Sequence, residues 1–140
     1  MKRHKSLIPL SQDHHHGLML AQLIKKGAPE YKGLPTDLAG KVNHVKDSWK
    51  TELKIHFENE ENILFPIVSG NDGEIDDLIK TLLEEHERII SLISQLDTSN
   101  EKEKVLNELG VLLELHIRSE ERNLFEKIQD VFPDKLDMLE

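Results

Sequence analysis

Residues 56–65 read HFENEENILF, and residues 116–125 read HIRSEERNLF. Both stretches fit the pattern H-x-x-x-E-E-x-x-L-F, with identical residues at five matched positions that lie 60 residues apart. In each stretch a His precedes a Glu by four positions, a spacing that places both side chains on one face of an α-helix, one turn apart. The repeat therefore predicts two helices, each of which directs one imidazole and one carboxylate toward a common point.

A second repeat relates two other segments of the chain. Residues 10–24 and 82–96 share the pattern L-x-x-[DE]-H-x-x-x-[LI]-x-L-[AI]-x-x-[IL], in which His14 matches His86. The chain thus reads as two copies of one unit, each with a helix that carries a single His and a helix that carries His-x-x-x-Glu. Two such units packed about a pseudo-twofold axis would bring four His and two Glu side chains together.

Three consecutive histidines, His14, His15 and His16, compete for one of these positions. The repeat selects His14, because it alone keeps the apolar pattern found around His86. The apolar face of the same helix instead favours His16, since the Leu and Ile residues of the following turns lie closer to its side. We therefore predict His14 as the site residue and keep His15 and His16 as alternatives.

Pro and Gly residues divide the chain into four helical segments. No segment shows the strict alternation of apolar and polar residues typical of a strand, whereas apolar residues recur at helical spacing. We predict helices at about residues 11–28, 36–65, 74–96 and 101–129. Ser11, Thr36 and a capping box of Asn100 and Glu103 are the candidate caps. Short connections favour antiparallel neighbours, so the predicted fold is all-α, an up-down-up-down antiparallel four-helix bundle with a metal site in its core.

Length, charge and composition narrow the possible functions. A chain of 140 residues fits a single domain, in which residues 1–8 are expected to form a flexible tail. The absence of Cys excludes disulfides, thiolate nucleophiles and iron–sulfur clusters. The net charge of -9 argues against nucleic acid as a partner, and no apolar run approaches the roughly 20 residues that a membrane span requires. The expected location is the cytoplasm.

The environment of the two repeated glutamates indicates a metal site. Apolar residues lie one turn away from Glu60 and Glu120, which places both carboxylates toward the core. A buried carboxylate without a partner costs several kcal/mol, and a metal cation removes that cost. Neutral imidazoles and carboxylates suit iron, manganese or zinc. If both carboxylates bridge, each of two ions would have two His nitrogens and two carboxylate oxygens as ligands.

The chain resembles the hemerythrin family, specifically its bacterial HHE cation-binding type. The resemblance covers nearly the whole chain, so residues 1–140 are expected to form one hemerythrin-like domain. It implies two non-haem iron ions bridged by the two glutamates and capped by four histidines, with O2 or a related small oxidant such as NO as the ligand. Ferritin-like di-iron proteins differ, because they use Glu-x-x-His. The resemblance rests on an ordered set of metal ligands: His14, His56, Glu60, His86, His116 and Glu120.

Two features depart from the oxygen-carrying hemerythrins. Those proteins have a second His four residues from the one on the third helix, where this chain has Leu82 and Ile90 on either side of His86. They also carry an Asp one residue further along the fourth helix, whereas the carboxylate here is Glu120. The missing His leaves a coordination position open. We therefore expect oxygen or iron sensing, storage or redox chemistry at least as readily as reversible oxygen carriage.

A second hypothesis is a non-redox module, in which zinc or iron only stabilises a helical interaction or sensor domain. Both hypotheses leave open whether the chain is an enzyme. Several other polar residues are interpreted as part of the exterior, because they fall off the predicted ligand faces. They are Glu61, Glu121 and His44.

Overall fold

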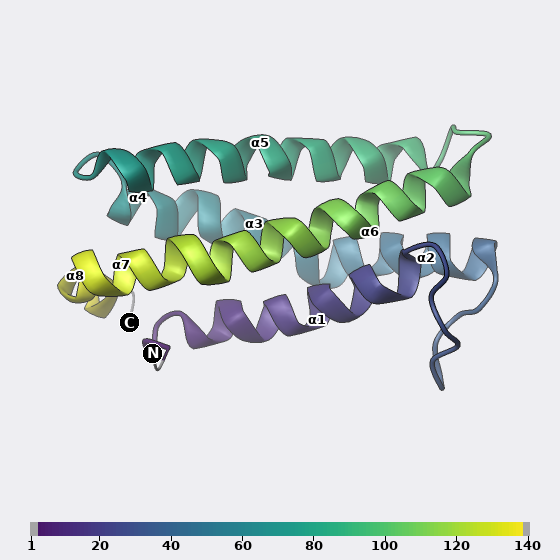
Figure 1. The fold of residues 1–140 in the computed structure, drawn as a ribbon, viewed down its shortest axis with the longest axis horizontal. Coiled ribbons are helices and arrows are strands. Elements are labelled where there is room, and N and C mark those ends of the chain that lie inside the picture. The colour runs from purple at the N-terminus through teal and green to yellow at the C-terminus, as the bar shows by residue number, and fades with distance from the viewer. Residues whose placement is uncertain (1–2, 139–140) are drawn as a thin grey trace.

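Four long helical rods lie along the length of the molecule (Figure 1). The computed structural model describes residues 3–138, and within them it contains helices but no strand. α1 (Ile8–Ile24) and α5 (Gly73–Gln95) each form one rod, while residues 38–68 and 102–131 form the other two. In Figure 1 the connections before the second and fourth rods lie at one end, and the turn before the third rod lies at the other. The predicted all-helical fold is confirmed.

The second and fourth rods contain π-helical turns. The second rod comprises α2 (Leu38–Ser48), η1 (Trp49–Leu53), α3 (Lys54–Asn59), η2 (Glu60–Leu64) and α4 (Phe65–Val68). The fourth comprises α6 (Lys102–Ser119), η3 (Glu120–Phe125) and α7 (Glu126–Val131), and is followed by the short α8 (Pro133–Asp137). Residues at the junctions keep right-handed helical dihedrals, so each rod is continuous. Two of the π-helical turns begin at the matched Glu60 and Glu120, and such turns are frequent at functional sites.

α1 begins earlier than predicted. Its first residue is Ile8, with Leu7 at the N-cap position and Pro9 in the first turn, where the N–H that proline lacks would have no intrahelical partner. Ser11 is therefore an interior residue of the helix and not its cap. The helix also ends four residues before the predicted boundary, at Ile24.

The other two predicted caps are also wrong. The carboxylate of Asp37, the residue after Thr36, caps α2 by accepting a hydrogen bond from the backbone N–H of Gly40 at 3.3 Å. α6 begins at Lys102 without a side-chain cap, so Asn100 and Glu103 do not form a capping box.

The segment predicted as a flexible tail makes specific contacts. Residues 1 and 2 lie outside the described part of the chain, but Leu7 is fully buried. The imidazole Nε2 of His4 lies 2.9 Å from Oδ1 of Asp137, and the backbone N–H of His4 donates to Oε1 of Gln129 at 2.7 Å. Residues 3–7 are therefore packed against the C-terminal part of the chain.

A polar layer divides the apolar core into two clusters. One cluster joins the C-terminal half of α1 to α2, η1, α3, the second half of α5 and the whole length of α6. The other joins Leu7 and the start of α1 to η2, α4, the first half of α5, η3 and α7. Between them lie the buried polar and charged residues of the described chain: His14, His56, Glu60, His86, His116 and Glu120.

α1 and α6 approach each other closely at Gly110. A Cβ atom at this position would lie 2.9 Å from the backbone oxygen of Ala21 and 2.7 Å from Cγ of Lys25. Because real Cβ atoms do not come this close to backbone, only glycine permits the approach. The contact holds α1, which carries His14, against the rod that carries Glu120.

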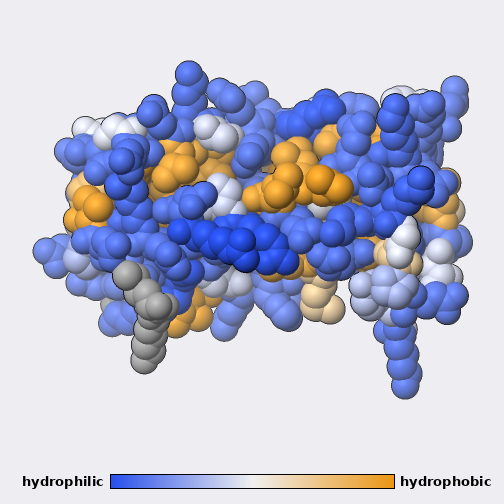
Figure 2. All heavy atoms as spheres, viewed as in Figure 1, coloured by the Kyte–Doolittle hydropathy of each residue, from blue (hydrophilic) through white to orange (hydrophobic). Residues whose placement is uncertain are grey.

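The exterior contrasts with this interior. Polar side chains cover most of the face drawn in Figure 2, and apolar patches remain where α5 and α6 lie. Leu115 of α6 is 60% exposed. Within residues 3–138, none of the helices combines the length and the apolar character that a membrane crossing requires.

Candidate metal centre

The structure brings all six sequence-predicted site residues together in the middle of the bundle. Each rod contributes: α1 supplies one His, α5 supplies another, and the second and fourth rods each supply a His and a Glu. None of the six residues is more than 3% exposed: His14, His56, Glu60, His86, His116 and Glu120.

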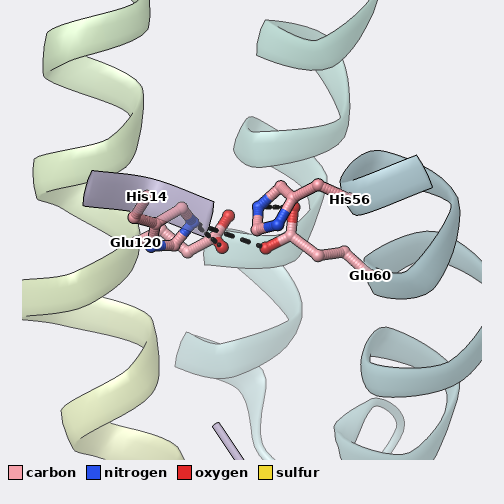
Figure 3. A group of neighbouring side chains, drawn as sticks. All are labelled: His14, His56, Glu60 and Glu120. Carbon is pink, nitrogen blue, oxygen red and sulfur yellow. Dashed lines mark ion pairs between the residues drawn. The ribbon is translucent and has the colours of Figure 1, made fainter. Parts of the chain in front are cut away.

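The six residues form two overlapping groups of possible metal ligands. The first group comprises His14, His56, Glu60 and Glu120, and it is drawn in Figure 3. The second group comprises His86 and His116 with the same two glutamates. Within each group the ligand atoms all lie within 4.8 Å of one another. Both carboxylates are therefore shared between the groups, whereas each group has its own pair of imidazoles.

The ligand atoms face one another without hydrogen bonds. Nε2 of His14 lies 2.9 Å from Oε1 of Glu120, and Nε2 of His56 lies 3.3 Å from Oε1 of Glu60. These are ion-pair separations rather than hydrogen bonds. As a result, the four Nε2 atoms and all four carboxylate oxygens are buried polar atoms that lack a hydrogen-bond partner. Native interiors seldom leave such atoms unpaired, because each buried polar atom without a partner costs folding free energy.

A metal cation fits this donor set. Every unpaired atom is either an imidazole nitrogen or a carboxylate oxygen, the ligands that first-row divalent ions accept. The six residues supply eight such donor atoms, four nitrogens and four oxygens. Bound cations would satisfy all of these atoms at once.

The far side of each imidazole is held by a carboxylate. Each Nδ1 lies within 3.1 Å of a carboxylate oxygen, which fixes the ring and leaves the Nε2 lone pair free to face the centre. In the first group Nδ1 of His14 donates to Glu121 at 2.5 Å, and that of His56 donates to Asp13 at 3.1 Å. In the second group the pairs are His86 with Glu61 at 2.9 Å and His116 with Glu85 at 2.7 Å.

The prediction that Glu121 belongs to a charged exterior is therefore wrong. For Glu61 the prediction is incomplete, because its side chain is 41% exposed but also holds His86. Each reaches the His of a neighbouring rod, Glu61 that of α5 and Glu121 that of α1. The signal was present in both repeats, because Glu61 and Glu121 are matched, and an acid precedes both His14 and His86. Helix-face spacing relates residues of one helix to one another, so it does not reveal these contacts between rods.

The last residue of the ten-residue repeat also has a role at the site. The Phe125 ring stacks on His14 with the centroids 5.4 Å apart, and the matched Phe65 stacks on His86 at 6.2 Å. Phe57 adds a closer stack on His86, at 3.8 Å and an interplanar angle of 12°. Aromatic rings thus cover the imidazoles where the polar layer meets the apolar clusters.

Electrostatic effects at the centre favour an ionised carboxylate at Glu60 and a neutral imidazole at His116 at neutral pH. Burial opposes ionisation of Glu60, but the nearby rings of His56 and His86 outweigh it and lower the pKa of this carboxyl. Burial also lowers the pKa of His116, against the raising effect of Glu85. An ionised carboxylate and a neutral imidazole are the protonation states that bind metals.

The alternatives to His14 lie outside the centre. His15 and His16 are exposed, and Nδ1 of His16 lies 3.5 Å from Glu52 at the surface. The neighbours of His86 on the same helix are Leu82 and Ile90, which have no imidazole to supply. Leu82 is buried in an apolar cluster, and Ile90 is 42% exposed.

The family model described as the hemerythrin HHE cation binding domain matches residues 9–128. The chain belongs to this family. The matched span includes all six residues of the centre and all four carboxylates behind the imidazoles. No curated protein and no solved structure matches the chain. Cation binding is thus the family property, and the residues that face one another in this hemerythrin HHE domain are chemically suited to it.

Proposed function

We propose that this hemerythrin HHE domain binds two iron ions, one in each group, with Glu60 and Glu120 bridging them. One observation carries the proposal: two sets of buried donors share both carboxylates and keep separate pairs of imidazoles. A bridging role for both glutamates is the assignment that gives all eight unpaired atoms a partner. Zinc and manganese accept the same ligands, and they are the competing metals.

The surroundings of the centre support iron and an oxidising ligand. An iron pair would supply one-electron redox chemistry toward O2 or a related small oxidant such as NO. Four carboxylates behind the imidazoles make the rings more basic, which favours higher oxidation states of a bound metal. Together with the two bridging glutamates they give six negative charges, enough to balance two ferric ions.

The apolar shell contributes by excluding water. The six residues are 0–3% exposed, and phenyl rings stack on His14 and His86. A water-poor site strengthens electrostatic interactions and limits the escape of reactive species. Sensing, storage and redox chemistry all make use of these properties.

The test is anaerobic loading with ferrous iron, followed by exposure to air or NO. We expect two irons per chain and a new charge-transfer absorption on exposure. His16→Ala is the matched control, because this exposed neighbour of the His14 turn should leave both readouts unchanged. Fewer than about one iron per chain at saturation, with no change in the spectrum, would overturn the proposal.

A second candidate function is a structural metal site in an interaction or sensor module. The burial of all six residues favours it, since structural sites are closed. This function predicts a large loss of stability on chelation but no spectrum that depends on oxygen. The same experiment therefore separates the two candidates.

We also propose the up-down-up-down order of the four rods. The connections between rods alternate between the two ends of the molecule in Figure 1, which supports this order. It places the ligand-bearing turn of every rod at the same level.

A further inference from the structure

The two halves of the centre are not supported equally. Glu121, which holds His14, has further partners: the Ser11 hydroxyl donates to both of its oxygens, at 3.0 and 2.8 Å. The guanidinium Nη2 of Arg3 lies 3.1 Å from Oε1 of the same carboxylate. Glu61, the matched residue in the other half, contacts His86 and is 41% exposed, against 23% for Glu121.

Arg3 contacts three parts of the surroundings of His14. Its Nη2 donates to the backbone oxygen of Glu121 at 3.3 Å, and its Nη1 donates to Gln129 at 3.4 Å. The guanidinium carbon lies 5.6 Å from the centroid of Phe125, the ring that stacks on His14. Arg3 therefore contacts both side chains that fix the orientation of the His14 imidazole.

The repeat shows why the second half lacks this support. Residue 10 aligns with residue 82, so Ser11 aligns with Leu83, which has no hydroxyl to donate to Glu61. Arg3 precedes the first copy of the unit, at the position that aligns with Ile75. The two polar residues that hold Glu121 are thus specific to the first half.

We propose that Arg3 and Ser11 are positioning residues, which orient His14 through Glu121 and so set the metal affinity of the first group alone. The inference rests on the two-ion centre proposed above. Loss of a residue behind a metal ligand lowers metal affinity about 10- to 100-fold. Arg3 is one contact further from the ion. Arg3→Gln should therefore lower the metal affinity about 10-fold, at the lower end of that range.

The experiment is a calorimetric titration of the full metal-free chain with Co²⁺. His14→Ala and His86→Ala first assign the two binding steps to the two groups. Arg3→Gln should then weaken the first-group step about 10-fold and leave the other step unchanged. Ser11→Ala should act in the same direction, and Arg3→Lys, which keeps the charge beside Glu121, should restore most of the affinity.

His4→Ala is the matched control. His4 belongs to the same segment as Arg3, but its imidazole contacts Asp137 and Ser6 and not Glu121. It should leave both steps unchanged. The inference would be overturned if Arg3→Gln and His4→Ala weakened metal binding equally. It would also be overturned if Arg3→Gln lowered the affinity of both steps equally, or of neither. If the wild-type chain binds fewer than two Co²⁺ ions, the two-ion centre itself fails and this inference fails with it.

Discussion

Two adjacent residues, Glu60 and Glu61, should respond very differently to replacement by Ala. Oε1 of Glu60 lies 3.3 Å from Nε2 of both His56 and His86, and Glu60 belongs to both ligand groups. Glu61 lies on the far side of His86, with its Oε2 2.9 Å from Nδ1, and belongs to neither ligand group. The first replacement removes a carboxylate from both proposed sites, whereas the second removes support from one imidazole.

The expected magnitudes follow from these contacts. Glu61→Ala should weaken one of the two binding steps about 10- to 100-fold, which corresponds to about 1.4 to 2.7 kcal/mol. Glu60→Ala should weaken both steps by about 100-fold or more, because each ion loses a charged ligand and not an outer partner. Calorimetric titration with Zn²⁺, together with the metal content of the dialysed protein, measures both effects.

The matched pair also defines what would refute the reasoning. If Glu60→Ala keeps one site at the wild-type affinity, Glu60 does not bridge. If Glu61→Ala weakens both sites equally, the carboxylates behind the imidazoles do not act on single ligands. Thermal unfolding of the two metal-free variants checks that neither replacement has simply disrupted the fold.

Four further predictions concern the stability and composition of the centre. Chelation of two ions, each present at about 100 times its Kd, should remove roughly 5 kcal/mol of stability and lower Tm by roughly 15–20 °C in a circular dichroism melt. His14→Ala should lose one ion per chain, while His16→Ala should keep both by elemental analysis. Gly110→Ala should destabilise the chain by about 1–3 kcal/mol in urea unfolding, since its Cβ would clash with the backbone of α1. Burial of Glu121 opposes its ionisation, but His14 and its other partners lower its pKa below the ordinary value of 4.5. The metal-free chain should therefore gain stability from Glu121 above about pH 4.5 and lose it on acidification, so the effect of Glu121→Gln on urea unfolding should be smaller at pH 3 than at pH 7.

The two repeats carried most of the information about the centre. His-x-x-x-Glu determines which side chains share a helix face, and the matched single histidines identify the other two rods. The resulting six residues are the ones that meet in the core. The repeat was also a better guide than the apolar face of the first helix, because His14 is buried and His16 is exposed.

Other features depend on contacts that no local pattern encodes. The role of Glu121 is set by His14 and Arg3, which lie more than 100 residues away in the chain. Two helices also begin at other residues than predicted. α1 begins before Ser11, because Pro9 is tolerated in a first turn, and α2 begins after Asp37, which caps it in place of Thr36. The π-helical turns at Glu60 and Glu120 have no signature in the apolar pattern, although the repeat places them at matched residues.

Anomalous X-ray diffraction from crystals of the iron-loaded chain tests the central claim most directly. We expect two iron peaks in the polar layer. Each peak should lie about 2 Å from the Nε2 atoms of two histidines, from one oxygen of Glu60 and from one oxygen of Glu120. A single peak, or peaks bound away from these carboxylates, would contradict the account.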